Sequence, residues 1–365
     1  MKTASANRRR FLKGATLGAV GAAAASSFPA PAIAQGKIRW KMVTSWPKNF
    51  PGLGTGAQRI ADAITEMSDG RLTVKLYAAR ELVPAFEVFD AVREGNAEMS
   101  HDAAYYWVAK SKLTPFFCTV PGGLTMQEHN AWIYYGGGQE LWDELYAGFG
   151  LRAFLAGGSG VQMGGWFQKE INSLDDFKGV KMRIPGLGAE VVNRLGGTAV
   201  NLPGGEIMPA LQSGVIDATE WVGPWNDLAF GFYKIAKFYY GPGFHEPSSA
   251  LECLINLAAW EALPKDLQAI VRHACTAENA RMPAEFTAAN GESQTVLVNE
   301  HGVDIRHFPD DVIKEMYRLA AEVVAETSAE GDLGKRIYQS WSKFRREAVA
   351  RGPYAEQGYM NNRAL

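Results

Sequence analysis

The chain has 365 residues, of which 47% are hydrophobic and 11% aromatic, so it can build a large core and is not a disordered polymer. Its 37 Lys and Arg residues nearly balance 39 Asp and Glu residues, and no basic tract follows residue 13. This excludes the clustered positive charge that nucleic-acid binding requires. The length allows about two domains of about 150 residues each.

The N-terminal segment has the charge pattern of an export signal. The first 61 residues contain no Asp or Glu, and basic residues at positions 2, 8–10 and 13 precede a mildly apolar stretch over 14–25. Residues 8–13 (RRRFLK) resemble a twin-arginine signal, and Ala32-Ile33-Ala34 before Gln35 predicts the cleavage site. The stretch is shorter than the roughly 20 apolar residues that span a bilayer. We therefore expect residues 1–34 to be removed and the mature protein to reach the periplasm.

The cysteines and histidines do not form a metal-binding pattern. The three cysteines, Cys118, Cys253 and Cys275, lack C-x-x-C spacing, and the six histidines are scattered singly. An exported protein can form disulfides, but an odd count allows one pair at most. We expect three buried free thiols, with a single disulfide as the alternative.

The first part of the mature chain alternates predicted strands and helices. Strands are expected at residues 38–43, 72–77 and 97–101, with helices at 56–68 and 83–95. This order is typical of a parallel α/β domain, in which ligands approach the carboxyl ends of the strands.

A second unit of the same kind is predicted after residue 150. Its expected strands are 152–156, 179–185, 199–202 and 215–220, and its expected helices are 189–195 and 205–213. The remaining elements are a strand at 250–256, a long helix from about 264 to 300, a strand at 303–307, and helices at 310–327 and 331–350. A chain that builds one domain, crosses, builds another and crosses back forms two lobes with a cleft for a small ligand.

Three stretches of the sequence resemble a known family, the solute receptors of tripartite ATP-independent periplasmic (TRAP) transporters. They are residues 70–74 with 81–82, residues 174–185 and residues 210–220. The resemblance covers nearly all of residues 36–325. It implies a two-lobed, type II-like periplasmic binding protein of the α/β class, with a hinge, an interlobe cleft and a C-terminal helical extension. The implied boundaries are 35–157 with 248–290 for lobe I, 158–247 with 291–327 for lobe II, and 328–365 for the extension.

Arg183 lies at the carboxylate-binding position of this family. A planar guanidinium in a closed cleft can hold a carboxylate through two parallel hydrogen bonds, which a lysine cannot do. The resemblance therefore implies that Arg183 binds the substrate. The alternative is an ordinary ion pair at the surface or between the lobes.

Within the family, residues 157–162, Glu220-Trp221 and residues 239–246 resemble the subgroup that receives 2-oxo acids or lactate. Members of that subgroup hold a cation beside the ligand, and the matching positions imply side-chain oxygens from Gln162 and Glu220, the backbone carbonyl of Trp221 and a further carboxylate from Glu246. Oxygen ligands suit Na⁺ or Ca²⁺. One carboxylate fits Na⁺, and a second would favour Ca²⁺. The resemblance also implies the membrane permease subunits of a TRAP transporter as partners.

The same residues allow structural interpretations. Glu220 is also compatible with a helix-cap or hinge carboxylate, and Gln162 with a loop residue that binds backbone. Tyr105 and Tyr106 are candidates for the first-lobe side of the cleft, but aromatic clusters often belong to a core. Pyruvate, longer 2-oxo acids, lactate and related hydroxy acids all remain possible ligands, because the sequence does not define the size of the pocket.

An enzyme is the main functional alternative. It would be a metal-assisted hydrolase or lyase of small carboxylates that uses Glu220 and Glu246 around a divalent ion. We predict no enzyme, because the sequence contains no recognisable set of acid, base and nucleophile. Residues 157–160 (GGSG) do not match the G-x-S-x-G nucleophile pattern, since Val161 occupies the position of the second glycine.

The C-terminal helical stretch carries an apolar face made of Leu333, Ile337, Trp341 and Phe344. This face can pack on the lobes of its own chain. The 2-oxo-acid subgroup also includes dimers joined by an exchanged C-terminal helix, and exchange costs little because the contacts already exist within the monomer. We therefore expect a homodimer, with residues 329–332 as the hinge for the exchange.

Overall fold

The structure is a computed structural model that describes residues 36–365. The predicted twin-arginine signal peptide, residues 1–34, lies outside the described residues. Across residues 36–365 we find no helix with the length and apolar character to cross a membrane. All three cysteines are buried free thiols, as expected.

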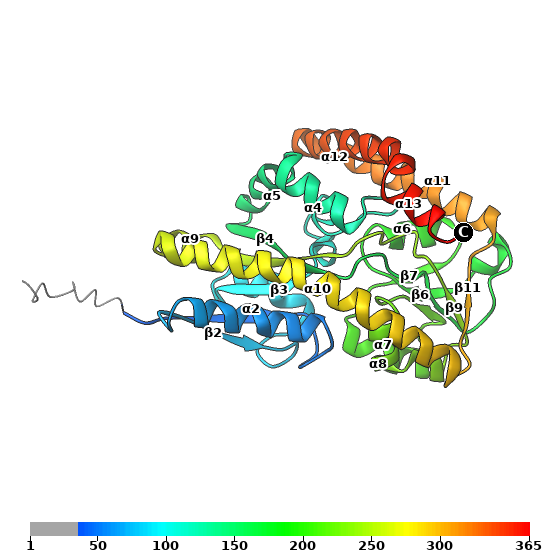
Figure 1. Cartoon of the computed structure of the whole chain (residues 1–365), viewed down its shortest axis with the longest axis horizontal. Coiled ribbons are helices and arrows are strands. Elements are labelled where there is room, and N and C mark those ends of the chain that lie inside the picture. The colour runs from blue at the N-terminus through cyan, green and yellow to red at the C-terminus, as the bar shows by residue number, and fades with distance from the viewer. Residues whose placement is uncertain (1–35) are drawn as a thin grey trace, which may run out of the picture. The chain divides into compact units, whose positions relative to one another are not determined.

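The first sheet has five strands in the order β2-β1-β3-β10-β4 (Figure 1). Its strands are β1 (Ile38–Thr44), β2 (Leu72–Tyr77), β3 (Met99–Asp102), β4 (Leu151–Gly158) and β10 (Ala250–Asn256). The first three strands are parallel, and β10 runs antiparallel to β3 and β4. Helix α2 (Leu53–Met67) packs on this sheet through Ala57, Ile60, Ala61 and Ile64, whose spacing puts them on one helix face.

The second sheet has six strands in the order β11-β9-β5-β8-β6-β7. They are β5 (Gly165–Phe167), β6 (Lys181–Arg183), β7 (Thr198–Val200), β8 (Ala218–Thr219), β9 (Phe238–Tyr240) and β11 (Asp304–Arg306). Strand β6 is parallel to both β7 and β8. The carboxyl ends of β6 and β8 therefore lie at the same edge of the sheet.

The helices surround these sheets. The α-helices not yet described are α3 (Val88–Arg93), α4 (Met126–Tyr135), α5 (Gly138–Ala147), α6 (Gly188–Arg194), α7 (Gly204–Gln212), α8 (Pro224–Phe230), α9 (Leu257–Ala262), α10 (Lys265–Asn299), α11 (Asp310–Glu326), α12 (Gly331–Arg351) and α13 (Glu356–Asn362). The 3-10 helices are η1 (Ala85–Glu87), η2 (Ala104–Trp107), η3 (Thr114–Phe117), η4 (Leu174–Phe177), η5 (Phe232–Lys234), η6 (Thr327–Ala329) and η7 (Gly352–Tyr354). Figure 1 shows α10, in yellow, as the long helix that runs past both sheets.

The two predicted α/β units and the C-terminal helices are confirmed, but two expectations about the sheets were wrong. The strand expected at 152–156 does not begin the second unit, because β4 pairs with β10 in the first sheet. The first sheet is also not purely parallel, because β10 returns from the second unit and inserts between β3 and β4 in the antiparallel direction. Contacts between such distant segments leave no periodic signal in the sequence.

The chain passes between the two sheets three times. Residues 159–164 connect β4 to β5, residues 241–249 connect β9 to β10, and α10 leads back toward β11. The first two connections are joined directly, because the backbone N–H of Gln162 donates to the carbonyl of Glu246 (3.0 Å) and that of Gly243 donates to the carbonyl of Gln162 (2.8 Å). Helix α10 packs on β4 and α2 at one end and on α8 at the other.

Helix α12 packs against its own chain. Ile337 and Trp341 are buried, and the ring of Trp341 lies 5.4 Å from that of Phe116 in an edge-on contact. The indole N–H of Trp132 on α4 donates to Ser340 (3.1 Å). The apolar face predicted for this helix therefore has a partner within the chain, which was the alternative left open by the sequence.

Candidate functional site

The candidate site begins at the shared edge of strands β6 and β8. Arg183 is the last residue of β6 and Glu220 follows the last residue of β8, so the parallel pairing of these strands brings the two side chains together. Arg183 Nη1 donates to Glu220 Oε1 and also to the Glu220 carbonyl (3.2 Å), and Nε donates to the carbonyl of Leu202 (2.9 Å). The remaining nitrogen, Nη2, has no partner among the described residues.

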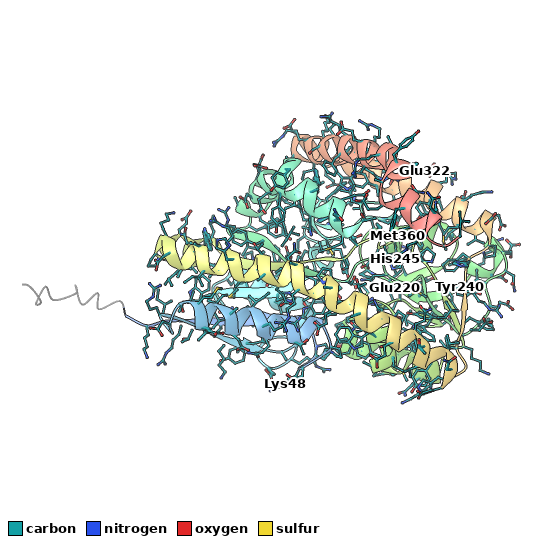
Figure 2. All side chains as sticks on the ribbon, in the orientation of Figure 1. Lys48, Glu220, Tyr240, His245, Glu322 and Met360 are labelled. Carbon is teal, nitrogen blue, oxygen red and sulfur yellow. The ribbon has the colours of Figure 1, made fainter. Side chains whose placement is uncertain are left out.

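The connection 241–249 adds two further polar residues to this pair. His245 Nε2 lies 3.2 Å from Glu220 Oε2, and Glu220, His245 and Glu246 each offer a ligand atom within 4.8 Å of the others. All three side chains are buried. Figure 2 labels Glu220 and His245, which lie close together. This group is a candidate cation site.

Several buried polar atoms in this region lack a hydrogen-bond partner within the described part of the chain. They are Arg183 Nη2, Gln162 Oε1, Glu246 Oε2, Trp221 Nε1 and His245 Nδ1. Leaving such a group unsatisfied costs about 1–3 kcal/mol, and more for a charged group. A cation held by the unpaired Gln162 and Glu246 oxygens, and an anion held by Arg183 Nη2, would satisfy three of these atoms. The residues present therefore fit a hard cation together with a carboxylate.

A small cavity adjoins the polar group. Its aromatic lining comes from segments that follow strands of both sheets. Trp46 follows β1 and Tyr105 and Tyr106 follow β3 of the first sheet, and Trp221 follows β8 of the second. The rings of Trp46 and Trp221 lie 6.3 Å apart, and the Arg183 guanidinium lies 5.1 Å above the Trp221 ring. The cavity has a volume of about 10 Å³, comparable to the space that one water molecule needs.

The electrostatics of the site favour a bound cation. Burial raises the pKa of the Glu246 carboxyl well above its usual range, and the nearby charge of Glu220 raises it further. Arg183 opposes both effects. A cation between the two carboxylates would lower the pKa of Glu246 again, because its positive charge would stabilise the ionised carboxylate against both burial and the charge of Glu220.

The structure brings together the residues that the sequence singled out. Gln162, Tyr105, Tyr106 and Trp221 line the cavity, and Arg183, Glu220 and Glu246 lie beside it. One detail differs from expectation, because Nη1 of Arg183 is engaged by Glu220 and only Nη2 lacks a partner. A carboxylate at Arg183 would therefore meet a single unpartnered nitrogen rather than two.

Sequence reasoning missed three residues of the site. His245 precedes Glu246, and its isolation from the other histidines concealed its contact with Glu220. Ser159 accepts a hydrogen bond from Gln162 Nε2 (3.0 Å), and Trp46 lines the cavity from the loop after β1. Ser159 and His245 could have been found because each is a polar residue close in sequence to a predicted cation-binding residue, Gln162 or Glu246. No sequence signal pointed to Trp46.

The chain is similar in sequence to known solute-binding proteins. Residues 42–330 match the model of the bacterial extracellular solute-binding protein family 7. The chain is 42% identical over 324 residues to a monocarboxylate 2-oxoacid-binding periplasmic protein of Nostoc, a match that covers 89% of this chain and 88% of the relative.

The chain is also similar in structure to solved TRAP solute-binding proteins. A TRAP periplasmic solute-binding protein of Pseudoalteromonas atlantica, with bound sodium and pyruvate, has a TM-score of 0.87 and 41% identity, covering 89% of this chain and 99% of the other. A TRAP solute-binding protein of Bordetella bronchiseptica has a TM-score of 0.87 and 36% identity, and the match covers 89% of this chain and 97% of the other. That protein was crystallised as a mixed-occupancy dimer with copurified calcium and picolinate.

Proposed function

We propose that this chain, which belongs to the bacterial extracellular solute-binding protein family 7 of TRAP transporter receptors, binds a small 2-oxo or 2-hydroxy monocarboxylate together with a cation. The observation that carries the proposal is the group of buried, unpartnered atoms formed by Arg183 Nη2, Gln162 Oε1 and Glu246 Oε2. The relatives with bound pyruvate or picolinate, and with sodium or calcium, support it.

The roles follow from the chemistry of each atom. Arg183 Nη2 would donate to one oxygen of the ligand carboxylate. Gln162, Glu220, Glu246 and the carbonyl of Trp221 would hold the cation through oxygen atoms. Tyr105 and Tyr106 would enclose the short carbon chain of the ligand. The cation contributes positive charge beside two carboxylates, which makes binding of an anionic ligand favourable there.

The proposed cellular role follows from the family. The receptor would act in the periplasm and deliver its ligand to the membrane permease subunits of a TRAP transporter. We propose that residues 35–157 with 248–290 and residues 158–247 with 291–327 act as the two lobes, and that 328–365 is an extension. We also propose a homodimer, in line with the dimeric Bordetella relative, and we propose that exchange of the C-terminal helix forms it.

Isothermal titration calorimetry with pyruvate tests the proposal directly. The mature chain, purified and freed of ligand, should bind pyruvate in the presence of Na⁺ or Ca²⁺, and native mass spectrometry should find one ligand and one cation per chain. Absence of binding to pyruvate, 2-oxobutyrate and lactate in the presence of both cations would overturn it.

The enzyme alternative makes a different prediction. A metal-assisted hydrolase or lyase would convert its carboxylate substrate, whereas a receptor returns the ligand unchanged. Incubation of pyruvate or lactate with the cation-loaded protein, followed by NMR of the small molecules, distinguishes the two. Recovery of the unchanged ligand after binding would favour the receptor.

A further inference from the structure

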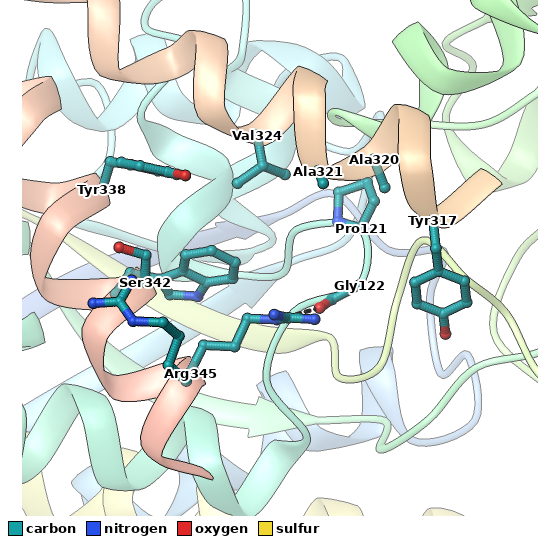
Figure 3. Close-up of a pocket in the computed structure, with 11 residues that line it drawn as sticks. Pro121, Gly122, Tyr317, Ala320, Ala321, Val324, Tyr338, Ser342 and Arg345 are labelled. Carbon is teal, nitrogen blue, oxygen red and sulfur yellow. Dashed lines mark hydrogen bonds between the residues drawn. The ribbon is translucent and has the colours of Figure 1, made fainter. Parts of the chain in front are cut away.

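A second cavity within residues 36–365 lies away from the candidate site, between helices α11 and α12. Its volume is about 210 Å³, which exceeds the roughly 150 Å³ of an apolar protein cavity that binds benzene. Figure 3 shows it between the two helices and the Pro121-Gly122 turn. A molecule with a six-membered ring and a small substituent is therefore of the right size.

One part of the cavity wall is apolar. Ala320 and Val324 contribute to it from α11, Trp341 from α12 and Pro121 from the turn, and all four are buried, whereas Tyr317, Tyr338 and Ser342 add hydroxyl groups elsewhere in the lining. Such a surface favours an apolar ligand body through the area that binding removes from water.

The charged part of the lining is purely basic. Arg345 and Arg346 line the cavity, and none of the lining residues is acidic. The neighbouring charges of α12 are paired, Lys343 with Glu347 and Arg351 with Glu356, whereas neither Arg345 nor Arg346 forms an ion pair anywhere in residues 36–365. Two guanidinium groups without carboxylate partners attract an anion.

The position of Arg345 is fixed by its contacts. Its Nε donates to the carbonyl of Gly122 (2.6 Å), and its guanidinium lies 6.0 Å from the Trp341 ring. Figure 3 shows the side chain extended toward Gly122, with Tyr317 and Tyr338 on opposite sides. Because Nε is used by the backbone, the terminal nitrogens are the groups left to meet a ligand.

From these observations we propose a second ligand site between α11 and α12, which binds a monocarboxylate with an aromatic or branched aliphatic body. The carboxylate would pair with Arg345 and Arg346, and the apolar body would lie against Ala320, Val324 and Trp341. This site is separate from the proposed pyruvate site, and it does not depend on the function proposed for that site.

Benzoate is a suitable probe, with benzamide as its uncharged counterpart. In calorimetric or NMR titrations of the mature protein saturated with pyruvate, benzoate should bind at least tenfold more tightly than benzamide. Arg345→Gln with Arg346→Gln should lower benzoate affinity at least tenfold, and Arg346→Gln alone about threefold. The single variant tests the site without loss of the Gly122 hydrogen bond, because Arg345, which donates that bond, is retained.

A control variant makes the result decisive. Arg351→Gln removes a guanidinium from the same helix outside the cavity and should leave benzoate binding unchanged. The proposal is overturned if benzamide binds as well as benzoate, if the double variant retains full affinity, or if saturation with pyruvate abolishes the benzoate binding seen without it.

Discussion

The indole N–H of Trp46 donates to Nδ1 of His101 at 2.8 Å, and this contact requires His101 to be neutral. Nε2 of the same ring lies 3.0 Å from the carbonyl of Ala156, so Nε2 carries the proton and Nδ1 accepts. Burial lowers the pKa of His101 from 6.5 to about 4. A residue that lines the candidate cavity is thus held by a histidine that must not be protonated.

The first prediction concerns acid stability. Between pH 6.5 and about 4 the unfolded chain binds a proton at His101 that the folded protein does not, so the free energy of unfolding falls as the pH is lowered through this window. His101→Gln should reduce this loss by about 3 kcal/mol. Urea unfolding at pH 7 and pH 4.5 measures it, with the exposed His273→Gln as control. An unchanged pH dependence in His101→Gln would contradict the assignment.

A second prediction concerns Asp227, whose pH dependence has the opposite sign. Its carboxylate accepts hydrogen bonds from Trp166 (2.9 Å), Tyr239 (2.7 Å) and the backbone N–H of Val222 (3.3 Å). Burial nevertheless raises the pKa of Asp227 from 3.8 to about 7. Between these values the folded protein keeps a proton that the unfolded chain has released, so raising the pH lowers the stability.

Asp227→Asn should therefore gain stability relative to the unaltered protein as the pH rises from 4 to 8, by about 4 kcal/mol over the whole window. Melting temperatures measured at intervals across this range test the expectation. Asp311→Asn, an exposed position on α11, should follow the unaltered protein at every pH. A constant difference between Asp227→Asn and the unaltered protein would show that Asp227 does not titrate in this range.

The third prediction concerns ligand affinity. Arg183→Ala should weaken pyruvate binding by about 2–5 kcal/mol, because a buried charged partner of the carboxylate is lost. Arg183→Lys should also bind poorly, since an ammonium cannot reproduce the contacts with both Leu202 and Glu220. Calorimetry gives the affinities, with melting temperatures to verify folding. Arg194→Ala serves as a control outside the site, and full affinity in Arg183→Ala would refute the role.

A fourth prediction links the cation to the acid. If one cation contacts both the protein and the ligand, each must strengthen the binding of the other by the same factor. Removal of Na⁺ and Ca²⁺ should weaken pyruvate binding, and Glu220→Gln should weaken the binding of both. Glu246→Gln offers a second test that leaves the Arg183–Glu220 ion pair intact, and the exposed Glu206→Gln is the control. Pyruvate affinity that is indifferent to chelation and to added cation would exclude the bridge.

The fifth prediction concerns assembly. The mature protein should be a dimer in light scattering, and a chain that ends at Ala329 should be a monomer. The contacts of Trp341 with Phe116 and of Ser340 with Trp132 would then be made by the helix of the partner subunit. A monomeric intact protein at micromolar concentration would refute the exchange.

Much of the fold was predictable because its longer elements carry clear periodicity. The strand at Ile38–Thr44, the helix Lys265–Asn299 and the strand Ala250–Asn256 lie close to their expected bounds. Strands β5 and β9 were not predicted, and they pair with each other across about 70 residues of sequence, a contact that local patterns do not report. The position of β10 within the first sheet depends on contacts across about 150 residues, which local patterns do not report.

The candidate site was predictable only where the family resemblance supplied positions. The sequence around Arg183 and Glu220 does not show that the two side chains meet. Their contact arises because β6 and β8 are parallel neighbours. The same pairing explains why the geometry of Arg183 differed from expectation, since Glu220 occupies one of its terminal nitrogens. His245 reaches Glu220 from a different segment, and this convergence depends on packing alone.

The residues that connect the two sheets also supply atoms of the proposed site. Gln162 lies on one connection and His245 and Glu246 lie on the other, and the hydrogen bonds of Gln162 join the two connections. Any rotation of one sheet relative to the other must change the backbone dihedral angles of these connections. It would therefore shift the side-chain atoms of Gln162, His245 and Glu246 that form part of the proposed site. Substitutions at neighbouring glycines such as Gly160 and Gly243 should therefore alter the rate of ligand release together with affinity, even though neither residue has a side chain to contact the ligand.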